Sequence, residues 1–317
     1  MEMITLSSVK ISNPTLSGIQ TTVGNTPLLP LARLSENISP EVQVYAKAEW
    51  FNPGGSVKDR PALNIIRSAI SDGSLTPNKR LLDSTSGNMG ISYATFGAAM
   101  GVGITLVMPA NASPERIAIL RALGAELILS DPLEGSDGAI RTARELAVRN
   151  PNPYFYANQY DNPANWLSHY NSTGPEIFEG TSGEITHFIA GMGTSGTITG
   201  VTRYLRGQKP DVQTIAVQPD TSLHGLEGLK HMASTINPAI YEPGLPDDTL
   251  EISTETAHEM VRELAQKEGL FVGVSSGAAA AAALQIAQGL ERGVVVTVFP
   301  DAGYKYLSDK ALWQIED

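Results

Sequence analysis

The sequence predicts an α/β protein with two doubly wound parallel sheets, each covered by helices on both faces. Short runs rich in β-branched residues, such as 42–50 and 294–300, alternate along the chain with segments of helical periodicity. These runs are apolar throughout, which is typical of strands buried on both faces of a sheet. A length of 317 residues and a hydrophobic content of 42% are enough for two such units.

The expected elements follow one another in a regular order. In the first half, strands are expected at 42–50, 80–85, 103–110, 125–130 and 153–158, with helices at 61–73, 90–101, 114–124 and 139–148. In the second half, strands are expected at 185–193, 212–219 and 294–300, with helices at 195–207, 255–269, 277–291 and near the C-terminus. A stretch rich in Pro, Gly and Asp between 218–229 and 245–253 is either a disordered connection or a functional rim, and its length favours the rim.

Composition excludes several classes of partner and chemistry. The chain carries 22 Lys+Arg against 33 Asp+Glu, a net charge of −11, which argues against nucleic acid and anionic membranes. There is no cysteine, so disulfides, thiolate metal sites and a cysteine nucleophile are absent. The five histidines show no metal-ligand spacing, and none is assigned to catalysis. Without an evident signal peptide or membrane-spanning run, a cytoplasmic location is expected.

Lys58 stands in an unusual place, within the stretch "FNPGGSVKDRPALN". Gly54 and Gly55 allow the backbone to turn or to approach a ligand, and Pro61 suits the first turn of a helix. Lys58 is therefore expected at a helix N-terminus, although lysines usually favour the opposite end. Both the positive helix end and partial burial would lower the pKa of the lysine ammonium.

One strand-to-helix turn, 84–92, carries more polar residues than helix capping needs. It offers Ser84, Thr85, Ser86 and Asn88 together with two glycines. Such residues are preferred helix caps, but a single cap explains only one of them. Because ligands of doubly wound folds gather at the carboxyl ends of strands, this turn predicts an anion site, most naturally for a carboxylate.

A second turn, 191–200, has glycines in the G-x-G-x-x-G spacing of the dinucleotide fingerprint. An NAD-dependent oxidoreductase is therefore one alternative, but the next strand ends in Gln218 and Pro219 rather than in the expected acidic residue. Three hydroxyl side chains in the turn suit a terminal phosphate: Thr194, Ser195 and Thr197. At a helix N-terminus this combination predicts a monophosphate cradle.

A third turn, 273–283, places Ser275 and Ser276 before a helix of small residues. One serine is expected to cap the helix, which leaves the other free to face a ligand. A lysine, a monophosphate cradle and a carboxylate site together predict one cofactor, pyridoxal 5'-phosphate (PLP). PLP needs an amine for its aldehyde, a cradle for its phosphate and a partner for its ring nitrogen.

Five sequence blocks carry a resemblance to a known family. In order, they are "NPGGSVKDRPA", "TSGNMGIS", "NQYDNPAN…HYNSTGPEI", "GMGTSGTITG" and "GVSSGAA". They resemble the cysteine synthases among the fold type II PLP enzymes, and most closely the cysteine synthase B, or O-acetylserine (O-phosphoserine) sulfhydrylase, branch. The resemblance runs from 23–31 to 301–308, nearly the whole chain.

The resemblance implies a role for each site residue. Lys58 would form the Schiff base with PLP and act as general base, while Asn88 would bind the ring hydroxyl and Ser275 would face the pyridine nitrogen. The phosphate cradle would consist of Gly193, Thr194, Ser195, Gly196 and Thr197. The substrate α-carboxylate would contact Thr85, Ser86, Met89 and Gln159.

The resemblance also implies a fold and a reaction. The fold is tryptophan synthase β-like, with the cofactor between a smaller mobile domain, 46–159, that binds the substrate carboxylate and a larger domain, 1–45 and 160–317, that carries the phosphate cradle. The enzyme would be a transferase of cysteine biosynthesis that catalyses a PLP-dependent β-replacement. It would make L-cysteine from O-acetyl- or O-phospho-L-serine and sulfide or another sulfur donor, through an α-aminoacrylate intermediate. A homodimer is expected.

Two positions bear on the exact reaction. Met89 stands where the family commonly has threonine, which removes a hydroxyl from the carboxylate site. Lys230 stands where B-type relatives carry basic residues, and it would either pair with the phosphate of O-phosphoserine or be a solvated loop lysine. Other β-replacement enzymes, cystathionine β-synthase-like or diaminopropionate synthase-like, remain alternatives, as does a catalytically silent binding scaffold.

Overall fold

The computed structural model describes residues 16–85 and 87–313. Its strands are β1 Leu28–Pro30, β2 Val42–Ala48, β3 Arg80–Ser84, β4 Ile104–Pro109, β5 Glu126–Ser130, β6 Tyr154–Tyr156, β7 His187–Gly191, β8 Gln213–Pro219, β9 Asp248–Ile252 and β10 Gly293–Phe299. Its α-helices are α1 Asp59–Ser71, α2 Asn88–Met100, α3 Pro114–Ala122, α4 Gly135–Arg149, α5 Pro163–Ser168, α6 Gly174–Gly180, α7 Gly196–Gln208, α8 Thr254–Glu263, α9 Val274–Gln288 and α10 Lys310–Trp313. Two π-helices, His169–Thr173 and Leu264–Glu268, continue α5 and α8.

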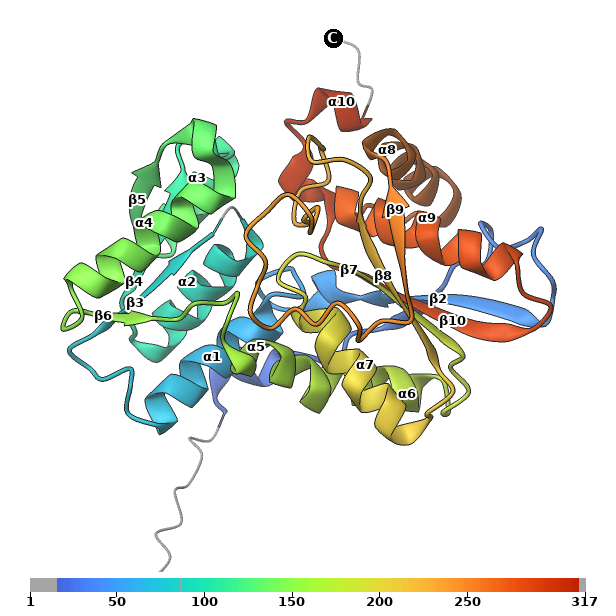
Figure 1. Ribbon diagram of the computed structural model, residues 1–317, viewed down its shortest axis with the longest axis horizontal. Helices are drawn as coiled ribbons and strands as arrows, with labels where there is room; N and C mark the ends of the chain where they lie inside the picture. The colour runs from blue at the N-terminus through green and yellow to red at the C-terminus, as the bar shows by residue number, and fades with distance from the viewer. Residues whose placement is uncertain (1–15, 86, 314–317) are drawn as a thin grey trace, which may run out of the picture.

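In the described residues the strands form two sheets, which lie side by side in Figure 1. The larger sheet has the order β1-β2-β10-β7-β8-β9 and is parallel except for β1, which pairs antiparallel with β2. The smaller sheet has the order β5-β4-β3-β6 and is parallel throughout. The predicted fold class, two doubly wound parallel sheets, is confirmed.

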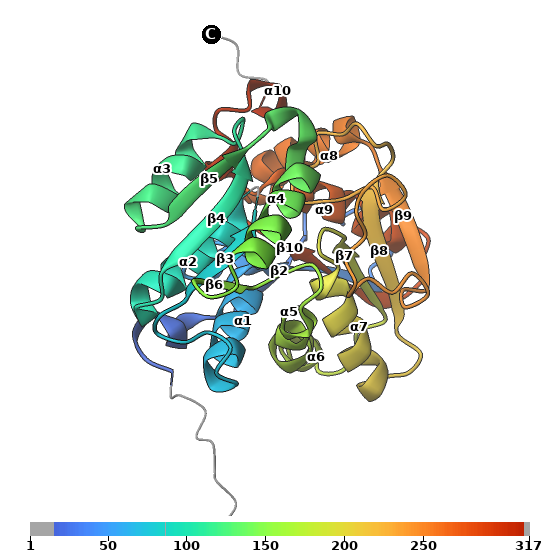
Figure 2. The same ribbon diagram turned by 60° about the vertical axis from the view of Figure 1, so that its left-hand side comes forward.

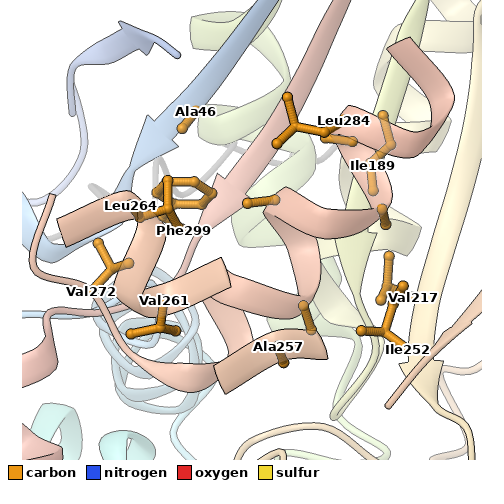
Figure 3. Close-up of a cluster of buried hydrophobic side chains, with 14 of the residues drawn as sticks. Ala46, Ile189, Val217, Ile252, Ala257, Val261, Leu264, Val272, Leu284 and Phe299 are labelled. Atoms are coloured by element: carbon orange, nitrogen blue, oxygen red, sulfur yellow. The ribbon is translucent and has the colours of Figure 1, made fainter. Parts of the chain in front are cut away.

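The strand β10 shows why the strands of the larger sheet are apolar throughout. Val295 and Phe299 point into the core beneath α8 and α9, whereas Val296 and Val298 point into the core on the other face, beneath α7. Successive side chains of a strand face opposite sides of its sheet, so a strand covered on both faces needs apolar residues at every position. Figure 3 shows the first of these cores around Phe299.

The smaller sheet is covered in the same way. Leu81 and Leu106 pack with residues of α1 and α2, whereas Leu82 and Val107 face Ala139 and Ala143 of α4 on the other side. Figure 2 shows α4 lying along these strands, opposite α2. Residues that follow β3, β7 and β10 line one pocket: Thr85, Gly193 and Pro300.

The sequence pattern missed several elements. It gave no strand at β1 or β9, and no helix at α5 or α6. β1 and α5 are short, and β9 alternates polar with apolar residues, so hydrophobic periodicity is weak in each. The expected domain boundary at residue 46 falls inside β2, whose seven residues all pair with β10 in the larger sheet. The chain thus leaves the larger sheet after Ala48.

Two further findings concern the described part of the chain. It contains no helix long and apolar enough to cross a membrane. It also contains no cluster of three or more His, Asp or Glu side chains that could hold a metal ion.

Candidate active site

A pocket lies where the turns of the two sheets face each other. Its walls include Lys58, Asn88 and Gln159, the glycine-rich turn after β7, Ser275 at the start of α9, and the loop that carries Lys230. The structure therefore brings together the three turns that the sequence singled out, although they are far apart along the chain. Ser86, which was expected to bind the carboxylate, lies outside the described residues.

Lys58 directly precedes α1, as expected from the glycines and Pro61 around it. The N–H of Val57 donates to the carbonyl of Pro300 (2.8 Å), and Ser56 forms an isolated bridge with Asp301, which fixes the lysine beside the end of β10. Lys58 is partly buried, and its Nζ has no hydrogen-bond or ion-pair partner among the described residues. Burial lowers the pKa of the Lys58 ammonium, and the Asp301 carboxylate partly opposes that shift.

The turn after β7 is shaped like a cradle at the N-terminus of α7, a 13-residue helix. A Cβ on Gly193 would overlap the carbonyl oxygen of Gly228, and one on Gly196 would overlap the Asn165 side chain. Ser195 adopts a left-handed conformation with φ of 68°. Its buried Oγ has no hydrogen-bond partner among the described residues, so the turn holds an unused polar atom at the N-terminus of a helix, where anions bind favourably.

The first turn of α9 differs from the expectation in one respect. Neither serine caps the helix, because the N-cap position is Gly273 and no side chain bonds there. The Ser276 Oγ is fully buried and lacks a hydrogen-bond partner in the described structure. Ser275 is buried and lines the pocket, in keeping with its expected position facing a ligand.

The turn after β3 is organised by Thr85. Its Oγ1 accepts hydrogen bonds from the N–H groups of Gly87 and Gly90, both at 3.1 Å, so the hydroxyl holds the turn that begins α2. Gln159 reaches the same turn, donating from Nε2 to the Ser84 carbonyl at 2.7 Å. Thr85, Met89 and Gln159 are buried yet line the pocket, so these three of the four predicted carboxylate residues converge.

Asn88 has partners that the sequence did not indicate. Its Nδ2 donates to Asp301 Oδ2 (2.7 Å) and its Oδ1 accepts from Lys305 Nζ (2.7 Å). An amide group has two donor hydrogens and two acceptor lone pairs, so one of each is still available for a ligand. The two bonds fix the orientation of the side chain that was expected to bind the ring hydroxyl of PLP.

Asp301 is a site residue to which the sequence reasoning gave no role. It is fully buried, and its Oδ2 also accepts the hydroxyl hydrogen of Tyr306 at 2.8 Å. Its Oδ1 has no hydrogen-bond partner among the described residues. One signal could have revealed it: an acidic residue two positions after the end of the apolar strand β10, at the edge of the sheet where ligands bind.

Lys230 is not a solvated loop lysine. Its side chain is only 8% exposed, and its Nζ lies 3.1 Å from Asp137 Oδ1 on α4. The same ammonium lies 3.4 Å from the carbonyl of Ile236 and 5.2 Å from the centre of the Tyr160 ring. Nearby, Arg116 of α3 pairs with Glu227 of the same loop. Two ion pairs therefore connect the loop at 225–232 to helices of the smaller sheet.

Comparisons with known proteins agree with this geometry. Residues 19–301 match the family described as Pyridoxal-phosphate dependent enzyme. The chain is 52% identical to the cysteine synthase of Aquifex aeolicus over 90% of this chain and 89% of the relative, and 43% identical to cysteine synthase B of Escherichia coli over 92% and 95%. The solved structure of cysteine synthase (OASS) from Entamoeba histolytica superposes with a TM-score of 0.90 at 38% identity, over 100% of this chain and 95% of that one.

The match to PLP enzymes excludes the alternative of an NAD-dependent oxidoreductase built on the G-x-G-x-x-G turn. The family match agrees with three features of the pocket: the lysine, the glycine-rich turn after β7 and the N-terminus of α7. The chain therefore belongs to the pyridoxal-phosphate-dependent enzymes, within the cysteine synthase family.

Proposed function

We propose that this cysteine synthase makes L-cysteine from O-acetyl-L-serine in preference to O-phospho-L-serine. The observation that carries the preference is the ion pair between Lys230 and Asp137 in the wall of the pocket. The cysteine synthase relatives support the formation of cysteine itself.

The residues of the pocket fit PLP. The unpartnered Ser195 Oγ and the glycines that leave no room for a Cβ are suited to a phosphate group, with Thr194 and Thr197 beside them. Asn88 would bind the ring hydroxyl and Ser275 the ring nitrogen. When bound, PLP supplies an aldehyde for an amine and a conjugated ring that stabilises negative charge at the substrate Cα.

Lys58 is proposed to remove the substrate Cα proton with its Nζ and later to return it. Its lowered pKa increases the neutral fraction that can accept a proton. A serine hydroxyl at the ring nitrogen does not force that nitrogen to stay protonated, as a carboxylate would. This environment favours rapid loss of the Cβ leaving group over racemisation or transamination.

The substrate carboxylate is proposed to bind at the turn that contains Thr85 and Met89, with Gln159 beside it. Thr85 Oγ1 already accepts hydrogen bonds from two backbone N–H groups. The hydroxyl itself donates only a long hydrogen bond, with 3.4 Å between Thr85 Oγ1 and the Gly87 carbonyl oxygen. The hydroxyl hydrogen is free to turn towards a carboxylate. We expect carboxylate binding to draw the smaller unit towards the larger one, which would exclude water from the pocket.

The choice of substrate follows from charge. The Lys230 ammonium is balanced by Asp137, whose second oxygen accepts the Ile236 N–H at 3.1 Å. A phosphate leaving group near Lys230 would therefore also meet the Asp137 carboxylate, whereas a neutral acetyl group would not. Close charges in a partly buried site interact by several kcal/mol, so the pair discriminates against the dianion.

The test is to measure kcat/KM for both substrates in the wild type and two variants. Asp137→Asn should raise the value for O-phosphoserine about tenfold relative to that for O-acetylserine, because Lys230 loses its counter-charge. Lys230→Ala should lower kcat/KM for O-phosphoserine below the wild-type value. A wild-type preference for O-phosphoserine, or equal effects of Asp137→Asn on both substrates, would refute the proposal.

The identity of the sulfur nucleophile is tested by comparing sulfide with homocysteine. A cystathionine β-synthase-like enzyme would use homocysteine in place of sulfide, so the products formed with each thiol separate the two reactions.

We further propose a cytoplasmic homodimer, on the basis of the family resemblance and the cysteine-free composition. Sedimentation analysis would check the dimer.

A further inference from the structure

We infer that His169 is a positioning residue for the phosphate cradle. Its Nε2–H donates to Thr197 Oγ1, and this bond directs the hydroxyl hydrogen of Thr197 towards the cofactor phosphate. The inference rests on the proposed cofactor site and adds a residue that lies behind it. The sequence reasoning assigned no histidine to the reaction.

Three side chains lie in a row that ends in the pocket. His169 begins the π-helix after α5, and the residue is 1% exposed. Its Nδ1 lies 2.9 Å from Thr173 Oγ1, and its Nε2 lies 3.3 Å from Thr197 Oγ1. Thr197 belongs to the first turn of α7 and lines the pocket, whereas Thr173 is fully buried behind it.

Hydrogen-bond accounting selects one tautomer of the histidine. Among the described residues, His169 Nδ1 is the acceptor available to the buried Thr173 hydroxyl. If Nδ1 carried the hydrogen, the Thr173 O–H would be buried without an acceptor, which is unfavourable. With Thr173 donating to Nδ1, the ring hydrogen lies on Nε2 and points at Thr197.

The direction of the second bond then follows. Thr197 Oγ1 accepts from Nε2–H, so its own hydrogen is left to donate elsewhere. A phosphate is an acceptor without competing donors, and the Thr197 hydroxyl faces the pocket where the cradle lies. The row therefore presents the cofactor with a hydroxyl whose donor role is set in advance.

The surroundings of His169 keep the ring neutral. Burial, together with the nearby Arg60 and Lys58 charges, lowers the pKa of His169 well below its ordinary value. Close packing also fixes the distance between α7 and the helical segment formed by α5 and the π-helix after it. A Cβ on Gly200 of α7 would overlap the carbonyl of Trp166 and crowd the Cβ of His169.

The test removes PLP from the purified holoenzyme and then measures, by equilibrium dialysis of the apoenzyme, the Kd for PLP and for pyridoxal, which lacks the phosphate. His169→Gln keeps an N–H near the position of Nε2, whereas His169→Asn places its amide near Nδ1. We expect His169→Asn to weaken PLP binding about three- to tenfold and His169→Gln to stay within about twofold of the wild type. Pyridoxal binding should be the same in both variants and in the wild type.

Two more variants separate positioning from packing. Thr173→Val lies outside the pocket and should weaken PLP binding about two- to fivefold, with no change for pyridoxal. Thr197→Val should weaken PLP binding about tenfold or more, and adding His169→Asn should cause no further loss. Additive losses, or equal losses for PLP and pyridoxal, would overturn the inference.

The same measurements distinguish failure of this inference from failure of the cofactor site. If the wild type bound PLP and pyridoxal equally, the cradle itself would be refuted. If the wild type strongly preferred PLP and the variants at 169 and 173 kept that preference, only the role of His169 would be refuted.

Discussion

Replacing Arg60 by methionine should destabilise the protein strongly, because this residue anchors the helix that follows Lys58. Its Nε and Nη2 donate to the two carboxylate oxygens of Glu49 at 2.7 and 2.8 Å. Its Nη1 and Nη2 donate to Glu176 at 2.6 and 2.8 Å. Lys47 completes the cluster, with Nζ 2.7 Å from Glu176.

The magnitude follows from what Arg60→Met leaves behind. Glu176 keeps Lys47 as a partner, but Glu49 is fully buried and keeps only the neutral donors of Thr26 and Asn52. Breaking a buried pair by removing one partner costs about 3–5 kcal/mol. At about 2–4 °C per kcal/mol for a large domain, the Tm should fall by about 6–20 °C.

The loss should also depend on pH. In the wild type, Arg60 lowers the pKa of Glu49, and Arg60 and Lys47 lower the pKa of Glu176 to about 2. Lowered carboxylate pKa values contribute stability above the unfolded pKa, near 4.5, which is lost as the pH falls towards the folded pKa. Without Arg60, burial should raise the pKa of Glu49, so its protonation relieves the variant at low pH. The difference in the free energy of unfolding between Arg60→Met and the wild type should therefore be smaller at about pH 5 than at about pH 7.

Urea unfolding at both pH values measures these differences. Arg149→Ala is the matched control, because it breaks an exposed pair with Glu145 and should change stability by less than about 0.5 kcal/mol. An Arg60→Met variant within about 1 kcal/mol of the wild type at neutral pH would show that the cluster does not anchor α1.

Two further predictions concern the reacting lysine. Borohydride reduction and peptide mapping should find PLP on Lys58, and Lys58→Ala should lose the linkage and at least about 100-fold of kcat, whereas a label elsewhere would contradict the assignment. Asp301→Asn keeps an acceptor for Asn88 and Tyr306 but removes the charge that raises the Lys58 pKa. Imine formation between the apoenzyme and PLP should therefore reach its half-maximal rate at a lower pH in Asp301→Asn, and an upward shift would contradict this reading.

Much of the fold could be predicted from the sequence because it depends on local periodicity. The apolar runs of the parallel strands and the helices between them were predicted within a few residues, as β10 and α7 illustrate. The short elements β1 and α5 were missed, since their strand or helix character is set by packing against neighbours. Lys58 and the glycine-rich turn were identified from residue types whose conformational properties are specific to a ligand site.

By itself, the sequence determined the α/β class, the lysine, the three turns and the family to which they belong. Only the tertiary structure showed that Asn88 lies between Asp301 and Lys305, that Asp137 neutralises Lys230, and that His169 stands behind Thr197. Asn88 and Asp301 are separated by 213 positions, and Lys230 and Asp137 by 93. Such pairs leave no periodic signal in the chain, because side chains so far apart in sequence meet only after the two sheets have packed together.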